Sequence, residues 1–178
     1  RDLLLKRLID VRHNGMIKVI TGMRRCGKSY LLFNLFTDAL KAKGVDEENI
    51  VQINLEDRRN KSLRDPDKLL AYIDSRLKDN KMYYILLDEV QLVNEFEDVL
   101  NSYLQVKNAD VYVTGSNARF LSKDVITEFR GRGLEIRVHP LSFSEIRGAR
   151  PDEPIEQLWI EYITYGGLPQ VITMNSGQ

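Results

Sequence analysis

The feature that most constrains this 178-residue chain is the segment at 22–29, which reads GMRRCGKS and fits the pattern G-x-x-x-x-G-K-[ST]. A β-rich run at 18–21 precedes it, and a helical pattern over 28–42 follows. Phosphate oxygens need several N–H donors that converge on one point, and glycine allows the close approach and positive φ that such a loop requires. The helix that begins near Lys28 also directs its free N–H groups toward the anion. The sequence therefore predicts a phosphate-binding loop, or P-loop, between a strand and a helix.

Individual residues of this loop have different predicted roles. Lys28 is long enough to reach the β- and γ-phosphates of a nucleotide, and the hydroxyl of Ser29 is a ligand for Mg²⁺. For Arg24 and Arg25, contact with the ligand and simple exposure to solvent both stay open, and Cys26 is expected to pack without doing chemistry. The competing interpretation of the segment is an ordinary turn with a chance lysine. The predicted nucleotide-binding residues are Gly22, Met23, Arg24, Arg25, Cys26, Gly27, Lys28, Ser29 and Tyr30.

A second segment ends an apolar run at 83–87 with the acidic pair Asp88 and Glu89, which is the Walker B pattern of P-loop ATPases. Because the run is apolar throughout, the predicted strand is buried on both faces. A carboxylate at its end can hold Mg²⁺ directly or through water, so Asp88 is the predicted metal ligand together with Ser29. Glu89 is predicted to polarise the water that attacks the γ-phosphate. The competing interpretation is a turn, where Asp-Glu is also common.

Polar residues also end two other predicted strands. The sequence TGSN at 114–117 could bring Ser116 or Asn117 between the acidic strand and the P-loop, where either could contact the γ-phosphate or the attacking water. Capping of the helix that follows is an equally good interpretation of these residues. Asn54 could orient Glu89, although a polar residue that merely ends its strand is the favoured interpretation.

The order of the predicted elements indicates an α/β fold. Strands that alternate with helices imply right-handed crossovers and a parallel sheet. We therefore predict a three-layer P-loop NTPase fold with a mainly parallel five-stranded sheet, followed by the start of a helical lid. The predicted divisions are an N-terminal helix at 1–14, an ATPase core at 15–148 and the beginning of a lid at 149–178. Strands are predicted at 18–21, 50–55, 83–88, 111–115 and 134–138, and helices at 28–42, 66–78, 95–106, 117–128, 144–147 and 155–165.

Composition narrows the predicted surroundings and partners. The 26 basic and 26 acidic residues cancel, so there is no overall basic footprint for nucleic acid. No apolar run approaches the roughly 20 residues of a membrane span, and the single cysteine excludes an internal disulfide. These features predict a cytoplasmic protein without a membrane partner. A local basic face could still form from Arg119, Lys123, Arg130, Arg132 and Arg137, although a solvated charged surface is the favoured interpretation of these residues.

Five segments together resemble an AAA-type ATPase, and more closely a prokaryotic ATP-binding family with an AAA-like core and an uncharacterised C-terminal domain. They are GMRRCGKS, YILLDEVQ, VTGSNARFLS, FRGRGLEIRVHPLSFSE and YGGLP, and they span nearly the whole chain in this order. The resemblance implies ATP as the ligand, which agrees with the absence of an evident [N/T]KxD guanine-binding motif. Full-length members of that family continue well beyond this point, so we expect the chain to be a fragment.

The resemblance also implies site residues that the pattern alone does not. Ser116 or Asn117 falls at the sensor position, and Arg132 falls near the place of an arginine finger, which a neighbouring subunit of a homo-oligomer would insert. An ordinary basic turn before a strand is the competing interpretation of Arg132. The segment at 167–169, Gly-Leu-Pro, resembles an element with which the lid of signalling ATPases touches nucleotide. Simple helix termination explains the same residues equally well.

The leading prediction is Mg²⁺-dependent ATP binding and hydrolysis, with ATP and ADP as ligands and an unknown target. One alternative is a nucleotide-dependent switch with little turnover, which the Gly-Leu-Pro element favours. Another is a DNA-associated ATPase, which salt-dependent DNA binding would reveal. A small-molecule kinase is a weaker alternative, because the adjacent Asp88 and Glu89 are typical of a hydrolase.

Overall fold

The computed structural model describes residues 1–116, 129 and 131–170. Within these residues, five strands form one sheet in the order β2-β3-β4-β1-β5, and each neighbouring pair is parallel. The predicted α/β fold with a parallel sheet is therefore confirmed, and each predicted strand lies within two residues of its observed bounds. The strands are β1 Ile17–Thr21, β2 Ile50–Asn54, β3 Tyr83–Asp88, β4 Ala109–Thr114 and β5 Gly133–Arg137.

The helices also follow the predicted order, but the helix predicted at 95–106 ends three residues earlier, at Tyr103, and there is a local difference after the P-loop. There, α2 and α3 are joined by a π-helical segment, Leu31–Phe36, so that one helical run extends from Lys28 to Ala42. Short 3-10 turns cover Glu47–Asn49, Arg58–Arg64 and Val90–Leu92, and the predicted helix at 117–128 lies outside the described residues. The α-helices are α1 Asp2–Asp10, α2 Lys28–Tyr30, α3 Thr37–Ala42, α4 Pro66–Arg76, α5 Phe96–Tyr103, α7 Phe143–Ala149 and α8 Ile155–Tyr165.

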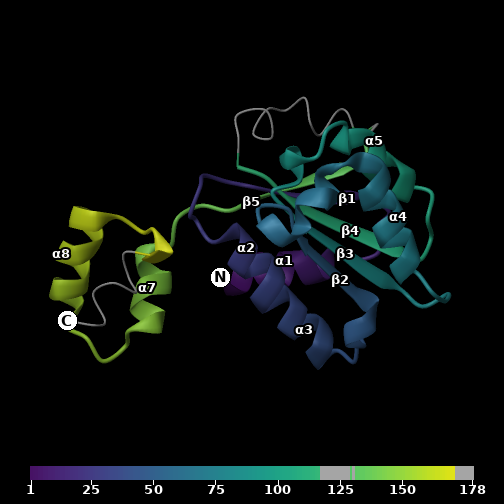
Figure 1. Cartoon of the computed structure of the whole chain (residues 1–178). Helices are drawn as coiled ribbons and strands as arrows, with labels where there is room; N and C mark the ends of the chain where they lie inside the picture. Colours follow the sequence, from purple (N-terminus) through teal and green to yellow (C-terminus); the bar gives the residue numbers. More distant parts are fainter. Residues whose placement is uncertain (117–128, 130, 171–178) are drawn as a thin grey trace.

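Two hydrophobic clusters, one on each face of the sheet, hold the layers together. Figure 1 shows α1, α2 and α3 on one side of the sheet, and α4 and α5 on the other. On the first face, Leu8 of α1 and Phe36 of the helical run pack against Leu86 and Tyr112. On the second face, helices α4 and α5 cover Val19, Ile85, Leu87 and Val113 of the same strands, and all four side chains are buried. Burial on both faces explains why β3 and β4 read as nearly continuous apolar runs.

Helices α7 and α8 form a separate pair beside the sheet, reached through the segment that leaves β5 (Figure 1). A capping box between Ser142 and Glu145 begins α7, and the ring of Phe143 meets Trp159 of α8 edge to face at 5.0 Å. The backbone N–H of Leu141 donates to the carbonyl oxygen of Gly167 at 2.7 Å. A Cβ on Gly167 would lie 2.0 Å from the carbonyl oxygen of Leu141, so only glycine permits this approach.

None of the helices in the described part of the chain is long and apolar enough to cross a membrane.

Candidate functional site

The P-loop follows β1 and curls back over the carboxyl end of the sheet. Gly22 has φ of 148°, and a Cβ there would lie 2.2 Å from the carbonyl oxygen of Val138. Gly27 has φ of 96°, a conformation that side chains other than glycine rarely adopt. Lys28 is only 4% exposed, and its Nζ donates to the carbonyl oxygens of Gly22 and Met23, both at 3.0 Å. The loop therefore holds the lysine ammonium against its own concave side, where phosphate oxygens would replace these carbonyl groups.

The variable residues of the loop face outward. The side chains of Met23, Arg24 and Arg25 are exposed, and so is that of Tyr30 in α2. Arg24 makes an exposed ion pair with Glu56 at 3.2 Å, which directs it toward the segment after β2. Cys26 is the inward residue: it is buried, its Sγ lies 3.4 Å from the carbonyl oxygen of Val138, and burial raises the pKa of its thiol. This agrees with the packing role expected for Cys26.

The two predicted metal ligands meet at the end of β3. The hydroxyl of Ser29 donates to Oδ1 of Asp88 at 2.9 Å, and the hydroxyl of Thr114 donates to the same oxygen at 2.5 Å. Strand β4 lies between β1 and β3, which brings Thr114 beside both motifs. The two motifs are therefore joined directly, although Ser29 and Asp88 are 59 residues apart in the sequence.

Burial dominates the electrostatics of Asp88, which is 2% exposed. Desolvation raises the pKa of its carboxyl group above the ordinary value, the hydrogen bonds from Thr114 and Ser29 offset part of this, and the nearby carboxylate of Glu89 raises it further. The site thus keeps a carboxylate in a place where its charge is costly to the metal-free protein. Such an arrangement is typical of a functional site rather than of a group selected for stability.

We expect Asp88→Asn to raise the melting temperature of the metal-free protein at pH 7. Asparagine keeps an oxygen that can accept from Ser29 and Thr114, and it removes the buried charge. If removal of the buried charge stabilises the folded state by about 1 kcal/mol, the melting temperature should rise by about 2–4 °C in a chain of this length. Thermal unfolding of both proteins, followed across pH with a metal chelator present, provides the measurement.

The sign of the pH dependence follows from the raised pKa of Asp88 in the folded state. The folded protein takes up this proton at a higher pH than the unfolded chain, so the wild type regains stability as pH falls through the raised pKa. The difference in melting temperature between Asp88→Asn and the wild type should shrink on acidification. It should vanish below about pH 4, where aspartate in the unfolded chain is protonated too. The control is Asp57→Asn, because hydrogen bonds from Arg59 lower the pKa of Asp57 to about 2, and this variant should gain nothing at pH 7. An Asp88→Asn advantage that widened on acidification would contradict the argument.

Glu89 adopts an unusual backbone conformation directly after β3. Its φ of 56° and ψ of 48° lie in the left-handed region, which costs a non-glycine residue about 1 kcal/mol or more. The turn is stabilised from β4, because the backbone N–H of Glu89 donates to Oγ1 of Thr114 at 3.1 Å. Oε2 of Glu89 accepts from Ser116 Oγ at 2.7 Å and also from Nε2 of Gln91. The structure therefore brings Glu89 together with Ser116, one of the two sensor candidates, whereas Asn117 lies outside the described residues.

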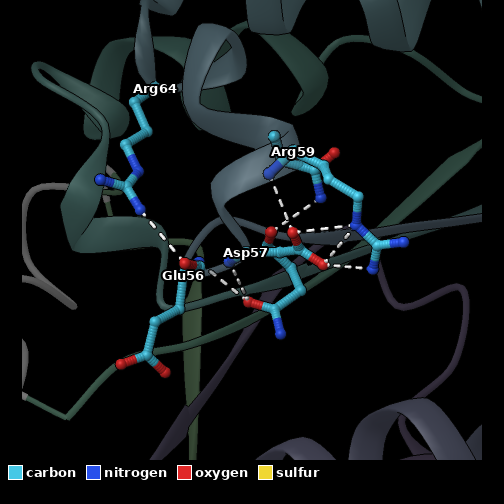
Figure 2. Close-up of polar contacts among 6 residues, drawn as sticks. Glu56, Asp57, Arg59 and Arg64 are labelled. Carbon is cyan, nitrogen blue, oxygen red and sulfur yellow. Dashed lines mark hydrogen bonds and ion pairs between the residues drawn. The ribbon is translucent and has the colours of Figure 1, made fainter.

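The segment after β2 forms the neighbouring wall of this edge and is braced by its own side chains (Figure 2). Arg59 chelates the carboxylate of Asp57 through Nε at 3.1 Å and Nη2 at 2.5 Å, and Arg64 donates to the backbone carbonyl oxygen of Glu56 at 3.3 Å. Oδ1 of Asn54 accepts from the backbone N–H groups of Glu56 and Asp57 at 2.8 and 3.2 Å. Asn54 thus stabilises the turn that ends its strand, as the favoured interpretation predicted, rather than orienting Glu89.

Arg132 does not join the P-loop of its own chain. Its exposed side chain precedes β5, and its carbonyl oxygen accepts from the backbone N–H of Ile17, at the amino end of β1, at 2.8 Å. The P-loop begins five residues later at the other end of β1, roughly 17 Å away along an extended strand. Within one chain, Arg132 is therefore on the opposite edge of the sheet from the P-loop, whereas its exposure makes it accessible to another subunit.

The Gly-Leu-Pro element lies beside the P-loop. A Cβ on Gly27 would be 3.6 Å from Cγ of Pro169 and 3.7 Å from Nη2 of Arg1. Arg1 Nη2 also donates to the carbonyl oxygen of Cys26 at 2.6 Å. The segment after α8 and the beginning of the chain therefore flank the loop, a position that nucleotide contact by Gly167–Pro169 would require and that helix termination neither requires nor excludes.

The residues at this edge fit a nucleotide and a magnesium ion. Glycines open the concave side of the loop, and the helical run that starts at Lys28 directs its first N–H groups toward it. Ser29 and Asp88 supply oxygen ligands only, which is the donor set that Mg²⁺ prefers, and Mg²⁺ commonly completes its shell with water and phosphate oxygens. Bound there, the ion would neutralise charge on the phosphate groups.

Residues 14–147 match a protein family described as the AAA domain, which covers most of the chain. The chain belongs to this AAA family. This AAA domain is therefore a nucleotide-binding domain of the ATPase type. The match includes the P-loop, Asp88 at the end of β3, Glu89, Ser116 and Arg132.

Two relatives of this AAA domain are considerably longer proteins. An uncharacterized protein of Haemophilus influenzae is 34% identical over 177 residues, which cover 97% of this chain and 44% of the relative. An uncharacterized protein of Methanocaldococcus jannaschii is 31% identical over 168 residues, which cover 87% of this chain and 36% of the relative. The AAA domain therefore spans less than half the length of these curated relatives. Among solved structures, PCH-2 of C. elegans superposes with a TM-score of 0.64 at 18% identity, covering 97% of this chain and 57% of the other, and shows the shared fold.

Two residues of the AAA domain site were missed by the sequence prediction. Thr114 contacts both Asp88 and the backbone of Glu89, and the available signal was a hydroxyl residue that ends the apolar fourth strand. Gln91 contacts the Glu89 carboxylate. Its only signal in the sequence was its place at the end of YILLDEVQ, one of the segments that resemble the family. No spacing rule predicts this contact, because it depends on the left-handed turn at Glu89.

Proposed function

We propose that this AAA domain binds Mg²⁺ and ATP and hydrolyses the β–γ phosphoanhydride bond. The observation that carries the proposal is the direct hydrogen bond between Ser29 and Asp88, which joins the phosphate loop to the acidic strand end. Lys28 and the loop N–H groups would bind the phosphates, and Ser29 and Asp88 would hold the metal. This arrangement would bring the γ-phosphate beside Glu89, at the carboxyl edge of the sheet.

In the proposed reaction, Glu89 acts as the general base. Its carboxylate accepts a proton from a water molecule as the water oxygen bonds to the γ-phosphorus, and the bond from that phosphorus to the bridging oxygen breaks. ADP leaves with the bridging oxygen, inorganic phosphate is released, and the proton on Glu89 returns to solvent. Ser116, hydrogen-bonded to Glu89 in this structure, is proposed to respond to the γ-phosphate as a sensor.

The test is phosphate release by the whole protein with ATP, with and without Mg²⁺. Turnover that requires Mg²⁺ supports the proposal. Tight ATP binding without turnover at any protein concentration would instead favour the second candidate, a nucleotide-dependent switch. The observation that favours the switch is the position of Pro169 next to Gly27, which would let bound nucleotide bias the placement of α7 and α8.

Lys28→Ala is expected to weaken ATP binding by at least about 100-fold, because the loop loses the single ammonium group that faces the phosphates. Binding of a fluorescent ATP analogue measures the effect. The matched control is Lys41→Ala, which removes a half-exposed lysine of the same helical run that pairs with Glu47 at the surface, at 3.1 Å. Unchanged affinity in Lys28→Ala would refute the assignment of the phosphate loop.

A DNA-associated role gains no support from the described residues. Of the five arginine and lysine residues of the conceivable basic face, Arg119, Lys123 and Arg130 lie outside them. The other two, Arg132 and Arg137, lie at opposite ends of β5, so they do not form a continuous basic face.

A further inference from the structure

The side chain of Gln91 has no role in the proposed reaction, yet it is bound to the group that would perform it. Gln91 lies in the 3-10 turn Val90–Leu92, directly after the left-handed residue Glu89. Its Nε2 donates to Oε2 of Glu89, the same oxygen that accepts from Ser116 at 2.7 Å. One oxygen of the carboxylate is thus held by two donors from two different elements.

This arrangement fixes the direction of the Glu89 carboxylate. Two donors on Oε2 restrict rotation about the last side-chain bonds, and Oε1 has no partner among the hydrogen bonds of the described residues. A general base needs a free oxygen aimed at the proton it accepts. The amide can serve this purpose in one orientation only, because reversing it would place two oxygen atoms against each other.

The oxygen atom of the same Gln91 amide has no hydrogen-bond partner in the described part of the chain. This oxygen, Oε1, is buried. A buried acceptor without a partner is rare and calls for an explanation such as a water molecule or a functional role. Here the unsatisfied oxygen belongs to a side chain whose nitrogen already binds Glu89, so a water molecule donating to it would lie close to the proposed base.

We propose that Gln91 is a positioning residue for ATP hydrolysis: its amide nitrogen orients the Glu89 carboxylate and its amide oxygen accepts from water beside it. The proposal rests on the proposed function, because it assigns Gln91 a role only through Glu89. Gln91 is not expected to contact the nucleotide. Its loss should therefore lower kcat and leave the affinity for ATP unchanged.

The test compares Gln91→Ala and Gln91→Met with the wild type in the whole protein. Methionine keeps the length and burial of the side chain but removes both amide groups. Both variants should lower kcat by about 10- to 100-fold, as expected when a catalytic group is misdirected, with KM and the binding of a fluorescent ATP analogue within about twofold. The matched control is Gln52→Ala, because the amide of Gln52 also donates two hydrogen bonds, to Phe33 and Thr37, but lies on β2 away from Glu89.

A second measurement separates positioning from a structural role. In the Glu89→Gln background, Gln91→Ala should change the residual rate less than about twofold, because no general base is left to orient. An equal loss in both backgrounds, or full turnover by Gln91→Met, would overturn the proposal while the wild type still hydrolyses ATP. A wild type that binds ATP without hydrolysing it would overturn the proposed hydrolysis itself, and with it this role of Gln91.

Discussion

Glu89→Gln is expected to lower the rate of ATP hydrolysis by about 10²–10⁴-fold and to leave ATP affinity within about twofold of the wild type. Glutamine has the same shape but cannot take a proton from water at neutral pH. The hydrogen bond from Ser116 can persist, because an amide oxygen still accepts it. The left-handed backbone is also no worse for glutamine than for glutamate, so the turn after β3 should survive. Phosphate release and binding of a fluorescent ATP analogue, measured on the same preparation, separate the two effects.

The matched control for this experiment lies six residues further along the same connection. Glu95 is exposed and also has a positive φ, of 53°, but it caps α5 through its backbone carbonyl. Glu95→Gln therefore repeats the chemical change at a comparable backbone conformation and should retain turnover. If Glu89→Gln hydrolysed ATP at the wild-type rate, Glu89 would not be the base, and another group would have to activate the water.

Sequence alone predicted the fold because its strongest local signals coincide with the sheet. A strand, a glycine-bounded loop and a helix occur consecutively at 18–42, and an apolar run ends in two acidic residues at 83–89. Strands β1, β3 and β4 are buried almost throughout and are recognisable as short apolar runs, whereas β2 and β5 each contain an exposed residue, Gln52 and Arg137. The bounds of the strands differ from the predicted ones by at most two residues, and the fold class followed from the alternation of strands and helices.

What the sequence could not predict are features that depend on distant contacts. The π-helical segment Leu31–Phe36 has the apolar spacing of an ordinary helix. The left-handed conformation of Glu89 contradicts local preference and is stabilised by Thr114, 25 residues away. The contact of Gln91 with Glu89 follows from that turn. Local patterns therefore predicted which residues reach the edge of the sheet, whereas the long-range contact with β4 decides how their side chains are directed.

Arg132→Ala is expected to lower ATP turnover by about 10³–10⁵-fold with little effect on ATP binding, if a neighbouring subunit supplies this arginine to the γ-phosphate. The position of Arg132 explains why a neighbouring subunit would be required. Arg132 is exposed at the amino edge of the sheet, whereas the P-loop of the same chain lies at the carboxyl edge, so it can act only between subunits. Lys107→Ala is the matched control, because Lys107 is an exposed basic residue at the same edge of the sheet.

If Arg132 acts between subunits, two further results are expected that an ordinary surface arginine would not produce. The specific activity of the wild type should rise with protein concentration as shared sites form. Mixing Arg132→Ala with Lys28→Ala should restore part of the activity, because one variant keeps an intact P-loop and the other keeps Arg132. Turnover that is independent of concentration, together with an active Arg132→Ala protein, would show that each chain hydrolyses ATP alone. Arg132 would then be a basic turn residue before β5, and the homo-oligomer would lose its main support.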